Sequence, residues 1–138
     1  MADIFDYSGK TAAGYPGMIA ETQFKDAASR RVETAPVAFG LAVGKGGKDG
    51  TVKLGGTGFV GIAVADLSMG DGYKVGDVGA FLRKGTIWVT ASNAVAAGDP
   101  VTFTPATGVI GKGLTGVIAD AVFETTGAQG DLVRIYLG

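Results

Sequence analysis

Glycine is distributed along this chain in a way that restricts what it can fold into. The sequence has 25 glycines in 138 residues, more than twice the roughly 7% that is typical of soluble proteins. They follow no three-residue period, and they separate short runs of β-branched and aromatic residues, such as 59–65 and 132–137. Glycines in such places permit tight turns and close backbone approaches. We therefore expect an all-β fold of many short strands.

The clearest strand pattern runs from residue 79 to residue 91. Apolar side chains alternate along it, so Ile87 and Val89 are expected to point into a core. Trp88 lies on the other side of the strand, together with Lys84 and two threonines. We expect Trp88 to be either half-exposed or covered by another segment.

Further strands are expected before and after this one, separated by turn-rich connectors. The expected strands are residues 37–43, 51–54, 59–65, 78–83 continuing through 86–91, 101–104, 114–123 and 132–137. About eight short strands fit a small β-barrel or a jelly-roll-like sandwich.

A weak internal repeat is also present. The matching pairs are residues 56–66 with 111–120, 76–78 with 130–132, and 36–39 with 100–103. The repeat indicates two similar β halves that pack together.

The first 35 residues differ from the rest because no period of 2 or 3.6 is sustained in them. They nevertheless carry several aromatic and apolar side chains that such a segment cannot bury within itself. We expect residues 1–35 to form an extended amino-terminal arm and residues 36–138 to form a single β-barrel or sandwich domain. The arm either tucks into its own sheet as a terminal strand or reaches a neighbouring molecule.

Composition excludes several classes of protein. The chain has 12 basic and 13 acidic residues, a net charge of −1, which argues against nucleic acid as a partner. It has no cysteine and no histidine, so thiolate chemistry and the usual general base are missing. The amino terminus does not resemble a signal peptide, and the longest apolar run has roughly seven residues, too short for a membrane span. We expect a soluble protein that is made in the cytosol and does not bind membranes.

No motif in the chain predicts catalysis, a cofactor or a metal site. Residues 56–61 and 111–116 both match the glycine pattern of dinucleotide-binding loops, but strand-like residues follow where a helix is required. The Ser8–Thr11 stretch lacks the earlier glycine of a phosphate-binding loop. Most aspartates adjoin a glycine, where an Asp side chain fixes a turn by bonding to the backbone.

Five stretches, taken in order and spacing, resemble the structural cement, or head-decoration, proteins of tailed bacteriophages. They are residues 16–20 (PGMIA), 39–43 (FGLAV), 61–64 (GIAV), 97–101 (AGDPV) and 130–136 (GDLVRIY). The resemblance implies a non-enzymatic β-barrel or jelly-roll-like domain with an extended arm. It also implies many copies on the outer surface of the virion head, bridging major capsid proteins, after assembly in the host cytoplasm.

Such a protein contacts its neighbours through exposed apolar groups, among which Trp and Tyr are the strongest anchors. We expect the capsid or neighbour contacts to be Ile4, Phe5, Tyr7, Tyr15, Pro16, Met18, Ile19, Phe24 and Trp88. Self-association as a homodimer or a homotrimer is consistent with this role. The alternative is a carbohydrate- or peptide-binding β module of a phage tail or adhesion structure, which requires aromatics gathered on one concave face.

Overall fold

The computed structural model of this chain describes residues 15–138, except for the side chains of residues 21–25 and Leu67. Over this range the fold is all-β, as expected. The elements are β1 (Ile19–Val32), β2 (Val37–Ala38), β3 (Ala42–Lys45), β4 (Thr51–Lys53), β5 (Thr57–Ala63), the 3-10 turn η1 (Leu67–Met69), β6 (Gly72–Tyr73), β7 (Val78–Thr90), β8 (Pro100–Phe103), β9 (Ile110–Gly111), β10 (Gly116–Phe123) and β11 (Leu132–Leu137).

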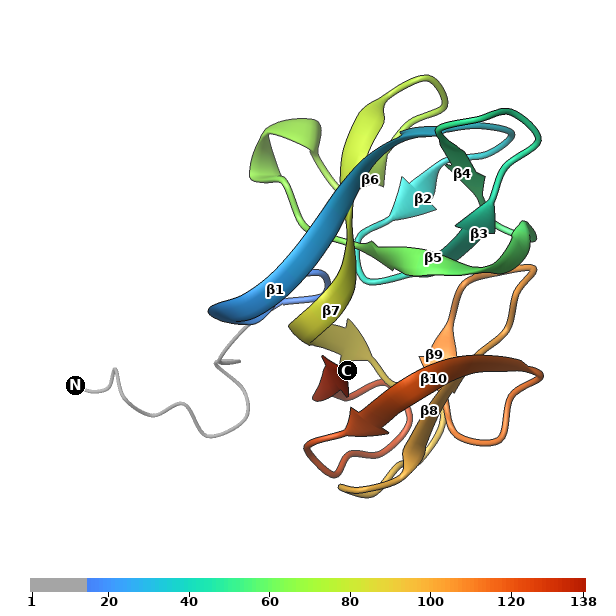
Figure 1. Cartoon of the computed structure of the whole chain (residues 1–138). Coiled ribbons are helices and arrows are strands. Elements are labelled where there is room, and N and C mark those ends of the chain that lie inside the picture. The colour runs from blue at the N-terminus through green and yellow to red at the C-terminus, as the bar shows by residue number, and fades with distance from the viewer. Residues whose placement is uncertain (1–14) are drawn as a thin grey trace.

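Five strands close into what we call the first barrel. β1, β4, β3, β5 and the first half of β7 are hydrogen-bonded in that order. β1 closes the ring because it pairs in parallel with β4 and antiparallel with β7. These strands form the upper group in Figure 1.

The second barrel follows the same plan. The second half of β7 pairs with β11, and the order continues through β10 and β8 to β9. Ala91, directly after β7, then forms a parallel bridge with Ile110 of β9 and closes the ring. β7 is therefore the last strand of one barrel and the first strand of the other, and Figure 1 shows it passing from the upper group to the lower.

Matching backbone hydrogen bonds show that the two barrels are structural repeats. In the first barrel, Val32 N donates to Asp77 O (2.9 Å), Ala63 N to Leu41 O (3.0 Å) and Val64 N to Ala80 O (2.9 Å). The corresponding bonds of the second barrel, in the same order, run from Ala91 N to Asp131 O (2.9 Å), from Phe123 N to Asp99 O (2.9 Å) and from Glu124 N to Arg134 O (2.8 Å). The expectation of two similar β halves is confirmed.

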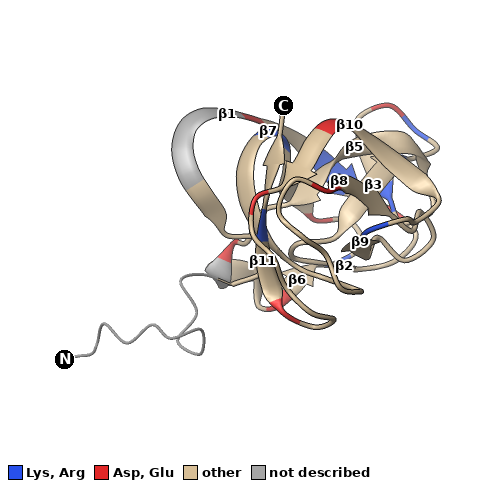
Figure 2. Ribbon diagram, turned by 90° about the horizontal axis from the view of Figure 1, so that it is seen from below, with Lys and Arg blue, Asp and Glu red and all other residues tan. Residues whose placement is uncertain are grey.

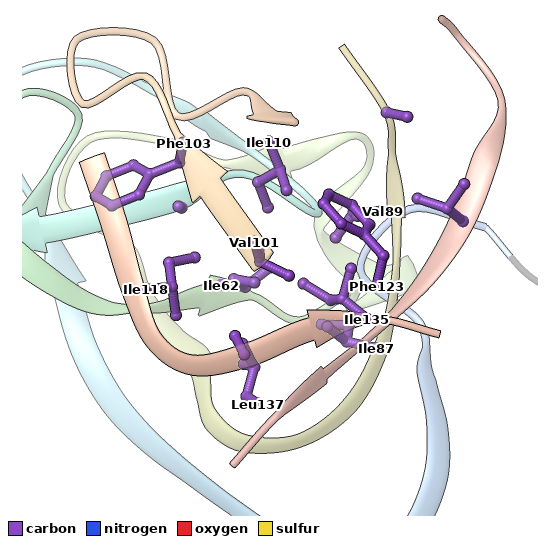
Figure 3. Packing of buried hydrophobic residues seen from close by; sticks show 14 of the residues in the cluster. Ile62, Ile87, Val89, Val101, Phe103, Ile110, Ile118, Phe123, Ile135 and Leu137 are labelled. Atoms are coloured by element: carbon purple, nitrogen blue, oxygen red, sulfur yellow. The ribbon is translucent and has the colours of Figure 1, made fainter. Parts of the chain in front are cut away.

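Each barrel has its own hydrophobic core, and the wall between them serves both. Val43, Ala63 and Phe81 point into the first barrel. Their neighbours along the same strands are Ala42, Ile62 and Leu82, which point the other way and belong to the core of the second barrel. Strand residues alternate between faces, so this wall is apolar on both sides. Figure 3 shows Ile62 among the residues of the second core, with Ile87, Val89 and Ile135.

Three similar turns lead into strands β7, β8 and β11. Asp77, Asp99 and Asp131 each follow a glycine with a positive φ, between 88° and 94°. The backbone amide of each aspartate donates to the carbonyl three residues earlier, and its carboxylate accepts from the amide of that residue. These aspartates therefore fix turns, as their pairing with glycine predicted.

Several expectations need correction. The arm does not extend to residue 35, because β1 is a wall strand of the first barrel. What remains of the expected arm precedes Ile19, and its residues 1–14 lie outside the described residues. The strand expected at 37–43 is divided by a turn, in which Leu41 N donates to Ala38 O and Gly40 takes a φ of +85°. The short strands β6 and β9 were not expected.

The repeat is also shifted from the one expected. Residues 36–39 do not correspond to 100–103, because the strand equivalent to β8 is β3, at Ala42–Lys45. Likewise, the equivalent of residues 56–63 begins near residue 116 rather than at 111. Only the match of Gly76-Asp77 with Gly130-Asp131 coincides with the structural repeat.

Charged residues of both signs are spread over several strands and loops (Figure 2). The described part of the chain contains no helix with the length and apolar character needed to cross a bilayer.

Gly130→Ala is expected to destabilise the fold by about 1 kcal/mol. Gly130 has a φ of +88°, and a Cβ there would meet no atom within 4 Å, so the cost is backbone strain alone. Urea unfolding followed by circular dichroism measures it. Gly47→Ala is the control, because Gly47 lacks a positive φ and its added Cβ would lie 3.4 Å from Glu33 Oε1. Equal stability of the two variants would contradict the assignment.

Acid is expected to remove a stabilising contact at Glu33. The Gly47 amide donates to Glu33 Oε1 at 2.5 Å, which lowers the pKa of this carboxyl below its ordinary value of 4.5. The carboxyl thus stabilises the folded state above pH 4.5 and loses this effect as the pH falls through its lowered pKa. Glu33→Gln should therefore be less stable than the unmodified chain at neutral pH, and the difference should shrink as the pH falls below 4.5. A difference in unfolding free energy that is unchanged in acid would contradict this.

Candidate functional site

The segment that leads into β1 lies against Trp88. Tyr15 to Met18 form a tight turn, in which Met18 N donates to Tyr15 O at 2.9 Å and Gly17 has a φ of +83°. Gly17 N then donates to Trp88 O at 2.7 Å, and Trp88 N donates to Met18 O at 2.9 Å. The base of the expected arm is thereby hydrogen-bonded to β7 at Trp88.

A residue other than glycine does not fit at position 17. A Cβ there would lie 2.8 Å from both Ala63 O and Phe39 Cβ. The carbonyl of Gly17 also accepts from Ala65 N at 2.8 Å. The turn therefore sits between β7 and the end of β5, and Tyr15 begins the described chain at this place.

The structure brings together part of the set of contact residues expected from the sequence. Tyr15 is 38% exposed, Pro16 is exposed, and Met18 and Trp88 are half-buried. Ile19 pairs with Ile87 and packs against the core of the second barrel, so its side chain has a structural role. The remaining members are Ile4, Phe5 and Tyr7, which lie outside the described residues, and Phe24. The side chain of Phe24 is also outside the described part of the structure.

Trp88 belongs to a row of outward-facing side chains that the sequence alone did not identify. Arg134 lies opposite Trp88 on β11, with its Cζ 5.9 Å from the centroid of the indole ring. Arg134 Nε lies 2.9 Å from Glu124 Oε1, beside it at the end of β10. The alternation of β11 turns Arg134 outward, but its partners depend on strand register.

A second outward row runs beside the first. Tyr136 lies opposite Val122 of β10, and Val122 in turn lies opposite Pro100 of β8. Tyr136 is 42% exposed and Val122 is 39% exposed. We call Trp88, Arg134 and Glu124 the charged row, and Tyr136, Val122 and Pro100 the apolar row. Together the two rows make the outer face of the second barrel.

Two hollows lie on either side of the turn after β2. The larger, of about 530 Å³, is lined mainly by apolar groups between β2 and β6, with Asp71 and Lys74 as its charged members. The smaller, of about 280 Å³, is lined by Pro16, Phe39 and Ser92 among others. Among the described residues, no three His, Cys, Asp or Glu side chains gather as metal ligands would.

Tyr73, beside the larger hollow, has a structural role. It is 2% exposed, and its ring packs between those of Phe39 and Phe81 at centroid distances of 5.2 and 5.6 Å. Its hydroxyl donates to Val64 O at 2.7 Å and accepts from Ala80 N at 3.3 Å. Burial raises the pKa of Tyr73 above its ordinary value, so this phenol stays protonated at neutral pH.

Comparison with known folds finds similar architecture in phage particles. A chain from the capsid of Myoviridae phage XM1 superposes with a TM-score of 0.71 at 18% identity, covering 91% of this chain and 90% of that one. The base of the head fiber gp8.5 of bacteriophage phi29 superposes with a TM-score of 0.57 at 15% identity, covering 83% and 95%. At these identities the likeness shows a shared fold. No curated protein matches the sequence.

The sequence itself matches a defined family over nearly its whole length. The family is described as structural cement protein (E217 gp24/Pam3 gp6), and the match covers residues 5–138. It therefore includes both barrels, the outer face at Trp88 and most of the segment before β1. This chain belongs to the structural cement protein family of bacteriophages.

Proposed function

We propose that this chain is a non-catalytic cement protein that binds the outer surface of a phage head and stabilises the contacts between neighbouring major capsid proteins. Two parts of the molecule make these contacts in the proposal. One is the segment before Ile19, and the other is the charged row of the second barrel at Trp88. The family membership supports the association with capsids.

The observation that carries the proposal is the difference between the two repeats at this row. Trp88, Arg134 and Glu124 correspond to Ser29, Ala80 and Val64 of the first barrel, at equivalent places in the hydrogen-bond pattern. The barrel therefore closes without large or charged side chains at these outward positions. Side chains that the fold does not require, and that are larger than their counterparts, are best explained by contact with another molecule.

The chemistry of the row suits a protein partner. Tryptophan and arginine are the residues most enriched at binding hot spots. Here the guanidinium of Arg134 lies between the indole ring and the carboxylate of Glu124, which restricts its side chain before binding. Such a row is one part of a typical interface of about 1,600 Å², and many copies on one shell make modest contacts effective.

The turn at residues 15–18 fixes the place where the preceding segment joins the barrels. Because Gly17 is hydrogen-bonded on both sides, to Trp88 and to Ala65, the chain enters at a fixed place beside the charged row. A segment of 14 residues that starts there spans up to about 45 Å when extended. In the proposal this segment contacts a neighbouring capsid protein.

The alternative function, a carbohydrate- or peptide-binding module, needs aromatics on one concave face. Tyr73 is buried in the first barrel, whereas Trp88 and Tyr136 lie on the outer face of the second. The tryptophan and tyrosines of the described chain thus do not converge on either hollow. The cement role remains the better supported of the two.

The double change Trp88→Ser and Arg134→Ala is expected to reduce binding to heads at least tenfold while the barrel stays folded. It gives the second barrel the residues that the first barrel has at the same positions. A tenfold loss corresponds to about 1.4 kcal/mol, modest for one hot-spot pair. Co-sedimentation with heads that lack this protein measures the binding.

The matched control for that experiment is Val75→Ser. Val75 is 54% exposed and belongs to a turn before β7, away from the charged row. Unchanged head binding by the double variant, with the control also unchanged, would refute the role of the row. A large loss of thermal stability would instead assign Trp88 and Arg134 to folding.

Deletion of residues 1–14 is expected to leave a folded protein that binds heads weakly. The deletion ends before Tyr15 because Gly17 and Met18 bond to Trp88, and their loss would disturb β7. Circular dichroism and thermal unfolding check the fold, and co-sedimentation checks binding. Full head affinity in the truncated protein would show that this segment is not an arm that contacts the capsid.

A further inference from the structure

One row of the first barrel is completely covered by the second barrel. Ala42 lies opposite Ile62, and Ile62 lies opposite Leu82, so the three form a line across β3, β5 and β7. All three are 0% exposed. They face outward from the first barrel and are buried only because the second barrel packs on them.

The equivalent row of the second barrel has no such cover. Pro100 lies opposite Val122, and Val122 lies opposite Tyr136, in the register of the covered row. Val122 and Tyr136 are 39% and 42% exposed, although their counterparts Ile62 and Leu82 are fully buried. Val117, on the same side of β10, is 71% exposed. An apolar group of this kind on a soluble protein marks an interaction site.

We propose that this apolar row, formed by Pro100, Val122 and Tyr136 with Val117, docks a second copy of this chain. The molecule itself shows what covers a row in this position, namely a barrel of the same fold. A second copy continues the packing that already joins the first barrel to the second. The proposal deepens the proposed function, because it names the surface through which cement subunits would contact one another.

Charge around the row also favours this partner. Arg134 and Glu124 form an ion pair on one side of the row. Asp99, next to Pro100, lies 3.5 Å from Lys112 Nζ. These pairs are balanced, and the exposed Asp120 of β10 adds one carboxylate beside the row. The rim therefore carries too little charge of one sign to attract a strongly charged molecule, and an apolar centre with a polar rim is usual for protein interfaces.

The test is the mass of the full-length protein in solution, measured by analytical ultracentrifugation up to about 100 μM, a range that detects weak specific association. The unmodified chain is expected to sediment as an oligomer of the 13.8 kDa subunit. Val122→Asp and Tyr136→Asp should each shift it to the monomer, with an increase in the dissociation constant of at least tenfold. Both positions are exposed, so the variants are expected to remain folded, as circular dichroism would show.

Val75→Asp is the matched control, because it adds the same charge at a valine that is 54% exposed in a turn outside the row. It should leave the oligomer intact. A monomeric unmodified chain over the whole range would overturn the proposal, and so would an oligomer that persists in both row variants. Loss of head binding by the row variants of a monomeric chain would assign the row to the capsid instead. The mass measurement itself uses no heads, so its failure is distinct from failure of the proposed function.

Discussion

The fold depends on the hydrogen bonding of β7 along both of its edges. Over its first half β7 pairs with β1 and β5, and over its second half it pairs with β11, with the start of β1 and with the residues just before β1. Among the strands of residues 15–138, β7 alone is a member of both hydrogen-bonded rings. The placement of Trp88 follows from this arrangement, because its backbone is held by Met18 on one edge and its side chain faces Arg134 across the other. The proposed contact surface is therefore built on a strand that is paired along both of its edges.

Close backbone packing makes the shared wall possible. A Cβ on Gly61 would lie 2.9 Å from Leu82 O and from Phe81 Cβ, so β5 approaches β7 more closely than a side chain allows. Gly44 and Gly56 approach each other equally closely, because a Cβ added to Gly44 would lie 2.5 Å from the carbonyl carbon of Gly56. The abundance of glycine thus has two physical causes here, positive φ angles in turns and close contacts between strands.

Sequence reasoning succeeded where one strand carries its own signal. β7 and β11 alternate clearly, so the inward Ile87 and Val89 and the outward Trp88 and Arg134 follow from periodicity. β1 was expected only as one of two alternatives for the first 35 residues, a terminal strand in its own sheet, and its bounds were not predicted, because only Ala28 and Val32 of its described side chains are buried. It is held by backbone pairing with β4 and β7, and no pattern within the strand reveals this. β6 and β9 have two residues each, too few for any period.

The proposed contact surface was predicted only in part, because the pattern within one strand does not show which residues of other strands lie beside it. Trp88 and the residues before β1 stood out by composition, but Glu124, Val122 and Pro100 join the site through register, which depends on turn geometry. The repeat was recognised but misaligned by its glycines. Gly61 lies against the backbone of β7, whereas Gly116 lies against the ring of Phe103, so the two glycines have different local functions.

The shared wall has a consequence for how the molecule comes apart. If the second barrel unfolded alone, the apolar side chains of Ala42, Ile62 and Leu82 would become exposed to water. The second half of β7 would also lose its pairing with β11. Neither barrel is therefore expected to stay folded without the other, and the two barrels should unfold in one cooperative transition. In the proposed role on a phage head, a strain that enters at one end would be shared by both barrels before either of them unfolds.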